Sequence, residues 1–548
     1  MRSGALQKYK GNQKSGSDHK KEKKMKKALL VLLAVLLVAG SVFAQSATET
    51  KASSGPDELT YWATLNAAIT ANSFDELPYW QELMARTNTK ITFQHVAANN
   101  NVAEAFAVLT ASRRSMPDII EYQWINYAGG PQKAIDDGVI IALNDYLDYA
   151  PNLKKFLETH PDIANMVKTD EGNYYCFPFL RGDTYENNTL LYTEGWVYRT
   201  DLLEKAGVYA IPETPDELYD ALVKIKASGL VEWPIAIRSD HINRVFAPGF
   251  DSWGENEGIY VDNGVVKSGL LEPNRYDYLV FLNKLYTEGL LYNDYLTLDK
   301  KGMGNLILNS TTAIGYAPGG SGIGTWLPQM QKEDPTVSMS SAKPLSPEKG
   351  RLSMFAKMDT IYSNAGASAA ITTSCKNIEA AMRLLDYQYS EEGHMLANYG
   401  IEGVSYKMEN GEPVYLEPVL NDNGVLDSTK AWQYMRFTIN GPFVQEPEAQ
   451  KYYYAVPELQ EALVLWAQTT YGEHDMSLIT VSSEHADDYA RIVNDVKTYA
   501  KEWENKFITG ATPLNEQTFA EYQAGLKGLK LEQAVAWRQE AYDKYISR

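Results

Sequence analysis

Cysteine is almost absent from the chain, which contains only Cys176 and Cys375 in 548 residues. Two thiols cannot form a disulfide framework, and they cannot supply a cysteine-based structural zinc site. The two positions stand far apart in the sequence, which does not show whether their side chains meet. One disulfide and two buried thiols therefore both remain open.

Basic residues are also scarce, with 51 Lys and Arg against 70 Asp and Glu and a formal net charge of −19. That balance argues against a protein that binds nucleic acid non-specifically through a broad basic surface. The hydrophobic share of 44% and the charged share of 22% are typical of globular proteins. They exclude a wholly disordered, collagen-like or polytopic membrane chain.

An apolar run extends from Ala28 to Ala39, and its twelve residues are too few to cross a bilayer, which needs about 20. Two lysines precede the run, and Val42-Phe43-Ala44 places small residues where a signal peptidase reads the chain. The pattern predicts a signal peptide over residues 25–44, cleaved after Ala44. Residues 1–24 are polar and Lys-rich, and we interpret them as a non-native upstream extension before a true start at Met25.

No cysteine stands at the predicted cleavage site, so lipid attachment is not encoded there. We therefore expect a periplasmic or secreted protein, with residues 45–57 as a polar linker. Residues 1–44 hold 10 basic and 2 acidic side chains, so cleavage leaves a net charge of −27. Such a surface does not suit an anionic ligand unless a local basic pocket exists.

The mature chain opens with alternating strands and helices. The hydrophobic patterns predict strands at 58–62 and 90–96 and a strand that starts at 117–120. Helices are expected around 75–88, at 103–114 and at 131–138, the last ending at Gly138. This order predicts an α/β lobe with a largely parallel sheet.

A second set of elements starts near residue 189, with strand-like segments at 189–192 and 196–198. Asp201 is expected to cap a short helix, and Thr214-Pro215 with Glu217 is typical of a helix start. Helices at 275–288 and 300–308 flank a predicted strand at 312–316. A helix pair over 377–398 is expected to break near Gly393, and the chain is mostly helical from residue 440.

Catalytic patterns are lacking. The histidines form no i, i+4 pair and no His-Glu-x-x-His, and there is no Gly-x-Ser-x-Gly. A calcium loop centred on residues 421–424 fails because Val419 and Lys430 occupy ligand positions. We therefore expect no catalytic residue, no metal site and no cofactor. Paired carboxylates for glycoside cleavage cannot be judged without distances.

The glycine-rich segment at 318–324, PGGSGIG, matches neither the phosphate loop nor the dinucleotide-binding pattern. A flexible turn and a ligand-contacting loop both remain open for it.

Ten short segments, in order along nearly the whole mature chain, resemble the family 1 extracellular solute-binding proteins of ABC importers. The resemblance is to the large oligosaccharide and uronate-type members, with a maltose-binding-protein-like fold. The segments include Met116-Pro-Asp-Ile119 and those at 138–146, 170–178, 198–207, 212–218, 286–290, 390–393, 398–406, 506–510 and 539–545.

The resemblance implies an α/β, two-lobe periplasmic-binding-protein fold of type II. Each lobe would be a mostly parallel sheet flanked by helices, with a ligand cleft between the lobes, extra C-terminal helices and closure about a hinge. The expected boundaries are residues 57–180 plus about 357–405 for the first lobe. The second lobe would hold 181–356 plus about 406–548.

By the same resemblance, twelve residues are candidate ligand contacts. Aromatic rings cover the C–H face of a sugar, and polar side chains bind its hydroxyls. Core packing is the alternative for each aromatic, and an ion pair is the alternative for Arg181, which could otherwise hold the carboxylate of an acidic sugar. The candidates are Trp62, Thr64, Asn66, Tyr122, Trp124, Asn126, Arg181, Trp196, Tyr198, Trp253, Tyr316 and Trp326.

The function that the resemblance implies is extracytoplasmic capture of a carbohydrate, expected to be an oligosaccharide, and its delivery to ABC-transporter permease subunits. We expect a monomer that binds no nucleic acid and is not an enzyme. Two alternatives remain, a secreted carbohydrate-active enzyme (a glycoside hydrolase or lyase) and a surface adhesion protein.

Overall fold

The computed structural model describes residues 55–65, 71–97, 101–113, 115–255, 258–362, 367–422, 424–436, 440–482 and 484–548. The predicted signal peptide, the upstream extension and Asn66 lie outside these residues. Residues 57–548 form one compact unit, which is described here. In the part of the chain that the structure describes, no helix combines the length and hydrophobicity of a membrane span.

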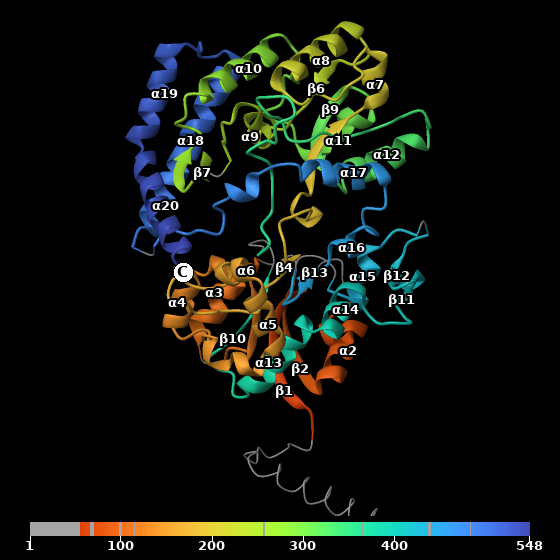
Figure 1. Ribbon diagram of the computed structural model, residues 1–548, viewed down its shortest axis with the longest axis vertical. Helices are drawn as coiled ribbons and strands as arrows, with labels where there is room; N and C mark the ends of the chain where they lie inside the picture. The colour runs from red at the N-terminus through yellow and green to blue at the C-terminus, as the bar shows by residue number, and fades with distance from the viewer. Residues whose placement is uncertain are drawn as a thin grey trace, which may run out of the picture. The chain divides into compact units, whose positions relative to one another are not determined.

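The first sheet has the strand order β10-β3-β1-β2, and we call the elements packed around it the first lobe. Strand β1 pairs in parallel with β2 and β3, whereas β10 pairs antiparallel to β3 (Figure 1). The predicted strands of this region are therefore confirmed. The strands are β1 (Asp57–Leu65), β2 (Thr89–Ala97), β3 (Ile119–Tyr122) and β10 (Ser368–Ile371).

Helices cover this sheet, and those predicted near 75–88, 103–114 and 131–138 are present. The helices are α2 (Pro78–Thr87), α3 (Val102–Ser112), α4 (Gly130–Asp136), α5 (Pro151–Thr159), α6 (Pro161–Met166), α13 (Ile378–Asp386) and α14 (Glu391–Tyr399).

The second sheet has the order β5-β9-β6, and the elements around it form the second lobe. Strand β9 is parallel to β6 but antiparallel to β5, so this sheet is mixed rather than mostly parallel. A separate antiparallel hairpin joins β7 to β8. The strands are β5 (Glu194–Tyr198), β6 (Trp233–Ile235), β7 (Ile259–Asp262), β8 (Val265–Ser268) and β9 (Thr312–Pro318).

The second lobe carries two groups of helices, and the extra C-terminal helices are as expected. Figure 1 shows α18 beside α10, and the two helices are in contact. The helices are α7 (Thr200–Lys205), α8 (Pro215–Ser228), α9 (Ile242–Phe246), α10 (Arg275–Thr287), α11 (Lys300–Leu308), α12 (Ile323–Gln331), α17 (Pro457–Trp466), α18 (Ala486–Thr509), α19 (Glu516–Gly528) and α20 (Leu531–Ile546).

A buried ion pair fastens α18 to α10. Arg275 is fully buried, and its Nε and Nη2 donate to Glu504 Oε1 over 3.0 and 2.7 Å. The Tyr522 hydroxyl of α19 donates to the same oxygen over 2.8 Å. The C-terminal helices are therefore an integral part of the second lobe.

Three described segments, at 181–193, 356–362 and 446–457, connect the lobes, and we call them the crossings. They start from a shared core, because β4 (Leu180–Arg181) pairs in parallel with β13 (Val444–Gln445). Arg181 N also donates to Ile361 O over 2.8 Å, which brings the second crossing alongside. The chain thus visits each lobe twice.

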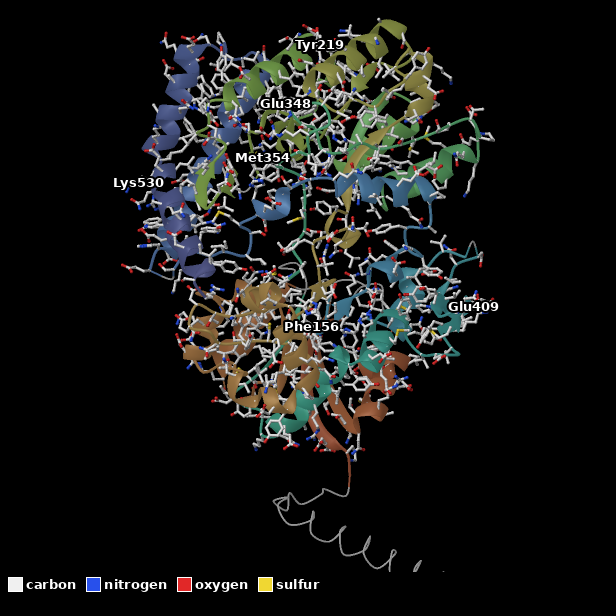
Figure 2. The ribbon with its side chains drawn as sticks, in the orientation of Figure 1. Phe156, Tyr219, Glu348, Met354, Glu409 and Lys530 are labelled. Carbon is white, nitrogen blue, oxygen red and sulfur yellow. The ribbon has the colours of Figure 1, made fainter. Side chains whose placement is uncertain are left out.

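Residues 406–445 pack with the first lobe, which differs from the expected boundary near 405. Arg436 Nη2 forms an ion pair with Glu121 Oε1 of β3 over 2.7 Å, and α15 contacts α2. Figure 2 labels Glu409 of β11 among first-lobe elements. The elements are β11 (Tyr406–Glu409), β12 (Glu412–Tyr415) and α15 (Ser428–Tyr434), and α16 (Pro447–Gln450) follows them in the third crossing. Helical periodicity in the sequence did not indicate which lobe these elements join.

Some local predictions need correction. Thr189–Leu191 is a 3-10 helix rather than a strand. Asp201 does not cap α7, because it pairs with Arg199, the residue at the cap. The break before α14 falls at Ser390, whose hydroxyl accepts from Gly393 N over 3.0 Å. A Cβ at Gly393 would lie 1.8 Å from Tyr387 O, so glycine permits this close turn rather than ending the helix.

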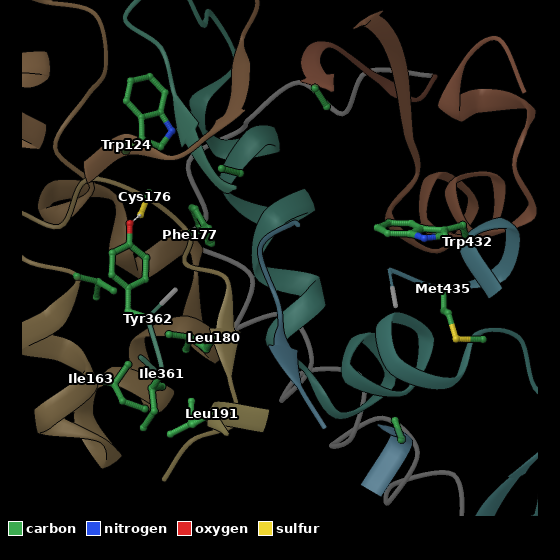
Figure 3. Close-up of a cluster of buried hydrophobic side chains, with 14 of the residues drawn as sticks. Trp124, Ile163, Cys176, Phe177, Leu180, Leu191, Ile361, Tyr362, Trp432 and Met435 are labelled. Carbon is green, nitrogen blue, oxygen red and sulfur yellow. Dashed lines mark hydrogen bonds between the residues drawn. The ribbon is translucent and has the colours of Figure 1, made fainter. Parts of the chain in front are cut away.

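The first hydrophobic core extends from the first lobe through the crossings into the second lobe, and Figure 3 shows a part of it. Cys176 lies in it, with its sulfur 3.7 Å from the Tyr362 hydroxyl. Both Cys176 and Cys375 are buried and free. Burial raises the pKa of each thiol to about 12, so neither is a reactive thiolate at neutral pH.

Candidate functional site

One edge of the second sheet gathers loop residues from three strands. Strands β6 and β9 are parallel, so their carboxyl ends share this edge. Strand β5 runs the other way, and its first residue, Glu194, pairs with Pro318 at the end of β9. Ligands of open α/β sheets bind beyond the carboxyl ends of the strands. This edge is therefore where a ligand is expected.

A hollow of about 560 Å³ lies at this edge, which is within the usual size range of ligand sites. Helix α11, strand β9 and helix α12 supply a largely apolar floor, and cationic side chains stand among the remaining lining residues. The lining is Arg238, Asp299, Lys300, Lys301, Met303, Gly304, Asn305, Leu308, Tyr316, Ala317, Pro318, Ser321 and Trp326.

A second hollow of about 500 Å³ continues the first, since both are lined by Lys300, Pro318 and Ser321. It extends to the first and third crossings. We call the two hollows together the sheet-edge groove. The additional lining residues are Arg181, Leu190, Thr193, Gly320, Thr325, Gln445, Gln450, Tyr453 and Tyr454.

The glycine-rich segment forms part of this groove through Gly320 and Ser321. Other glycines in it allow α17 to pack closely. A Cβ at Gly319 would lie 2.5 Å from Leu459 Cδ1, and one at Gly324 would lie 2.9 Å from Leu459 Cδ2. The segment is thus a packed turn that also borders the groove.

Where the groove meets the crossings, Asp359 binds two cations. Arg181 Nη1 donates to Asp359 Oδ2 over 2.5 Å, and Lys357 Nζ donates to Oδ1 over 2.8 Å. Burial alone would raise the pKa of Asp359, but Arg181 and Lys357 lower it below its ordinary value. Arg181 therefore holds the first crossing to the second beside the groove.

A second charged cluster lies at the start of β5. Arg244 pairs with Glu194, and its Nη2 lies 2.8 Å from Glu255 Oε2. The Tyr316 hydroxyl donates to Glu194 O over 3.5 Å, and its ring lies against His241 with centroids 5.3 Å apart. Burial raises the pKa of Glu255 despite the attraction of Arg244. The cluster fixes the strand that carries Tyr316.

Of the twelve candidate contacts, Arg181, Tyr316 and Trp326 line the groove. Trp253 does not line it, because its ring stacks on Phe355 at 5.2 Å.

Trp196 and Tyr198 lie on β5 and are 2% and 0% exposed within the second hydrophobic core. Burial raises the pKa of Tyr198, whose hydroxyl has no partner among the described residues. Ligand contact by either side chain would require its neighbours to move.

The first-lobe candidates are spread over the ends of β1 and β3. Trp124 is fully buried, and its Nε1 donates to Ile120 O over 3.3 Å. Trp62 is 4% exposed, and Tyr122 stacks on Phe106 at 3.5 Å. The remaining candidates are Thr64, half-buried on β1, Asn126, whose Nδ2 donates to Gln123 Oε1 over 3.0 Å, and Asn66, which lies outside the described residues.

The first-lobe edge is described only in part, because residues 66–70 and 98–100, which follow β1 and β2 in the sequence, are outside the described residues. Ligand contact by the first-lobe candidates therefore stays a prediction.

Several groove residues were not anticipated from the sequence, among them Lys300, Met303 and Tyr454. Lys300 follows Asp299, whose Oδ1 accepts from Gly302 N over 2.6 Å and caps α11. That cap was the available signal, since a helix start next to a strand end can border a site. Tyr454 carries no comparable pattern.

Two sheets joined by crossing segments, with a groove at a sheet edge, define the class of two-lobed ligand-binding proteins. The chain belongs to the bacterial extracellular solute-binding protein family, whose model matches residues 71–395, more than half of the chain.

A curated relative is the fructooligosaccharide ABC transporter substrate-binding protein FusA of Streptococcus pneumoniae serotype 4. It is 26% identical over 280 residues, which are 48% of this chain and 49% of FusA. The chain thus spans about half the length of that relative.

Two solved structures share the fold. The alginate-binding protein AlgQ2 is 23% identical, with a TM-score of 0.65 over 90% of this chain and 99% of AlgQ2. An HMO-binding, ABC-transporter-associated solute-binding protein from Bifidobacterium longum infantis is 17% identical. Its TM-score is 0.66, over 90% of this chain and 99% of that protein.

Proposed function

We propose that the protein is the extracytoplasmic solute-binding component of an ABC importer, and that it captures an oligosaccharide in the sheet-edge groove. The observation that carries the proposal is the groove itself, a continuous lining from the second sheet to the crossings in a member of this family. The names of FusA and AlgQ2 as carbohydrate-binding proteins support the class of ligand.

The chemistry of the lining suits a sugar chain. Tyr316, Met303 and Trp326 are largely buried, and the small parts of them that line the groove are apolar or aromatic, which suits the C–H groups of a sugar. Ser321 and Gln450 offer donors and acceptors to hydroxyls. Two connected hollows give room for more than one sugar unit.

The protein would act outside the cytoplasm without making or breaking a bond. It would bind its ligand as a monomer, close its lobes about the crossings and dock on permease subunits of the membrane. Cleavage of the predicted signal peptide after Ala44 would release it as a periplasmic or secreted protein.

A thermal-shift screen against an oligosaccharide panel tests the proposal, because a ligand that binds only the folded state raises the melting temperature. The tightest ligand is then incubated with the protein, and products are sought by mass spectrometry. A shift without product is expected. Turnover beyond stoichiometric amounts would instead favour a carbohydrate-active enzyme, and no shift with any sugar would remove the carbohydrate assignment.

Substitution in the groove locates the site. Trp326→Ala should weaken binding by roughly 1–3 kcal/mol, by analogy with aromatic stacking on bases. Trp537→Ala is the control, because Trp537 of α20 is half-buried against His485 and lies outside the groove. Equal effects of the two changes on affinity would place the ligand elsewhere.

A further inference from the structure

The charge of the sheet-edge groove is opposite to that of the chain. Acidic residues outnumber basic residues by 70 to 51 over the sequence. The groove lining reverses this ratio, with four cationic side chains and one carboxylate, Asp299. The four cations are Arg181, Arg238, Lys300 and Lys301. A local reversal of this kind concentrates anions at the site.

Neighbouring carboxylates neutralise only part of this positive charge. Arg238 pairs with Asp240, whereas Asp359 is shared by Arg181 and Lys357. One carboxylate for two cations leaves a positive excess at the crossings.

The nearby cluster of Glu194, Arg244 and Glu255 has one surplus carboxylate, but both of its acids bind Arg244. When this cluster and all the partners above are included, six cations still face five carboxylates.

Lys300 stands where the two hollows join, because it lines both. Lys300 and Lys301 are exposed, and neither takes part in an ion pair between described residues. The neighbouring Asp299 caps α11, because its Oδ1 accepts a hydrogen bond from Gly302 N. These two ammonium groups are thus available to a ligand.

Two guanidinium donors also lack partners at the groove. The Nε groups of Arg181 and Arg238 are buried and have no hydrogen-bond partner among the described residues. These two atoms have almost no solvent exposure, so a ligand oxygen could bond to them only after their neighbours moved. An anionic oxygen is a stronger acceptor for a guanidinium than a neutral hydroxyl is.

We propose that the sheet-edge groove selects an oligosaccharide that carries negative charge, as carboxylate or sulfate, with Lys300 and Arg181 as its recognition residues. The inference rests on the proposed carbohydrate function and adds the charge class of the sugar. It predicts that affinity falls as ionic strength rises, because salt screens exposed charges.

Matched pairs of sugars test this inference by calorimetry. Oligogalacturonates are compared with their methyl esters, which keep the backbone without the charge. Sulfated and desulfated galactan oligosaccharides form a second pair, and neutral maltose- and fructose-based oligosaccharides complete the panel. The charged member of at least one pair should bind at least tenfold more tightly than its neutral partner, and less tightly in 300 mM than in 20 mM salt.

The outcomes separate the two proposals. Binding of a neutral sugar as tight as that of every charged probe would overturn the charge inference and leave the carbohydrate function standing. Binding of no sugar in the panel would overturn both. The pair that binds distinguishes carboxylate from sulfate recognition.

Variants then locate the charge effect. Lys300→Gln should weaken binding of the charged probe about tenfold, and by a clearly larger factor than it weakens binding of the neutral partner. Lys224→Gln removes the same charge from the exposed side of α8, outside the groove, and should have no effect. Because Lys300 is exposed, its substitution is compatible with folding even if Arg181→Gln is not. Equal effects of the two lysine changes would contradict a local role.

Discussion

The buried ion pair between Glu121 and Arg436 should be far more important for stability than an exposed pair on the same sheet. Glu121 on β3 and Arg436 are each 3% exposed in their side chains. Glu58 on β1 pairs with Lys90 on β2 over 2.9 Å, but those side chains are 72% and 64% exposed. The two glutamates therefore form a matched comparison in which burial is the main difference.

The expected magnitudes follow from what each substitution leaves behind. Glu121→Ala would leave the Arg436 guanidinium buried without a counter-charge, which costs roughly 3–5 kcal/mol. It would also remove the acceptor that the buried Tyr61 hydroxyl reaches over 2.7 Å. Glu58→Ala would lose a solvated pair, whose contribution is about 0.2–1 kcal/mol.

Urea unfolding, followed by circular dichroism and tryptophan fluorescence, measures the two losses. A double variant, Glu121→Leu with Arg436→Met, should recover most of the stability because no charge remains buried. If Glu121→Ala and Glu58→Ala cost the same within about 1 kcal/mol, water reaches the first pair in solution. The packing of residues 424–436 against β3 would then differ from the one described here.

Three further changes have defined outcomes. Trp124→Ala should lower stability by roughly 3–5 kcal/mol, since its side chain is fully buried; an unchanged melting curve would mean that Trp124 is free to meet a ligand. Asp170→Asn should remove the ion pairs that join Asp170 to Lys544 and Arg548, at about 0.2–1 kcal/mol each. Burial opposes ionisation of Asp170, but these two cations lower its pKa in the folded protein. The stability that Asp170 contributes is therefore complete above its unfolded-state pKa and is lost as pH falls through its folded-state pKa. The melting temperatures of parent and variant should converge in acid. Burial lowers the pKa of His241 in the folded protein to about 4. Between about pH 6.5 and pH 4 the unfolded chain therefore binds a proton at this histidine and the folded chain does not, so the free energy of unfolding falls as pH falls. His241→Gln should flatten that part of the pH profile of the melting temperature, and an unaltered slope would assign it to other groups.

Most helices and strands could be predicted because their signals, such as caps and hydrophobic periodicity, lie within a few neighbouring residues. Thr214 accepts from Glu217 N and Pro215 opens α8, as the sequence indicated. Gly393 shows the limit of such reasoning. Its role is to let the chain pass Tyr387 O, and a contact of that kind is invisible without the neighbouring turn.

The site was harder to predict because aromatic side chains have the same sequence signature in a core and in a ligand site. Trp124 and Trp326 both follow a strand in the sequence and both belong to the first core, but only Trp326 also lines the groove. What separates them is the set of side chains packed on each ring. Lys300 was missed for a related reason, since an exposed lysine at a helix start is common on any surface.

The twofold visit of the chain to each lobe also sets the order in which the protein can fold. Glu121 and Arg436 are 315 positions apart, and β3 receives its neighbour β10 only from residues 368–371. While a growing chain is shorter than this, the first lobe has an open sheet edge and an unpaired buried acid. Contacts of such long range are slow to form because the intervening loop must first be closed. The first lobe is therefore complete only after the second visit of the chain has delivered β10 and Arg436.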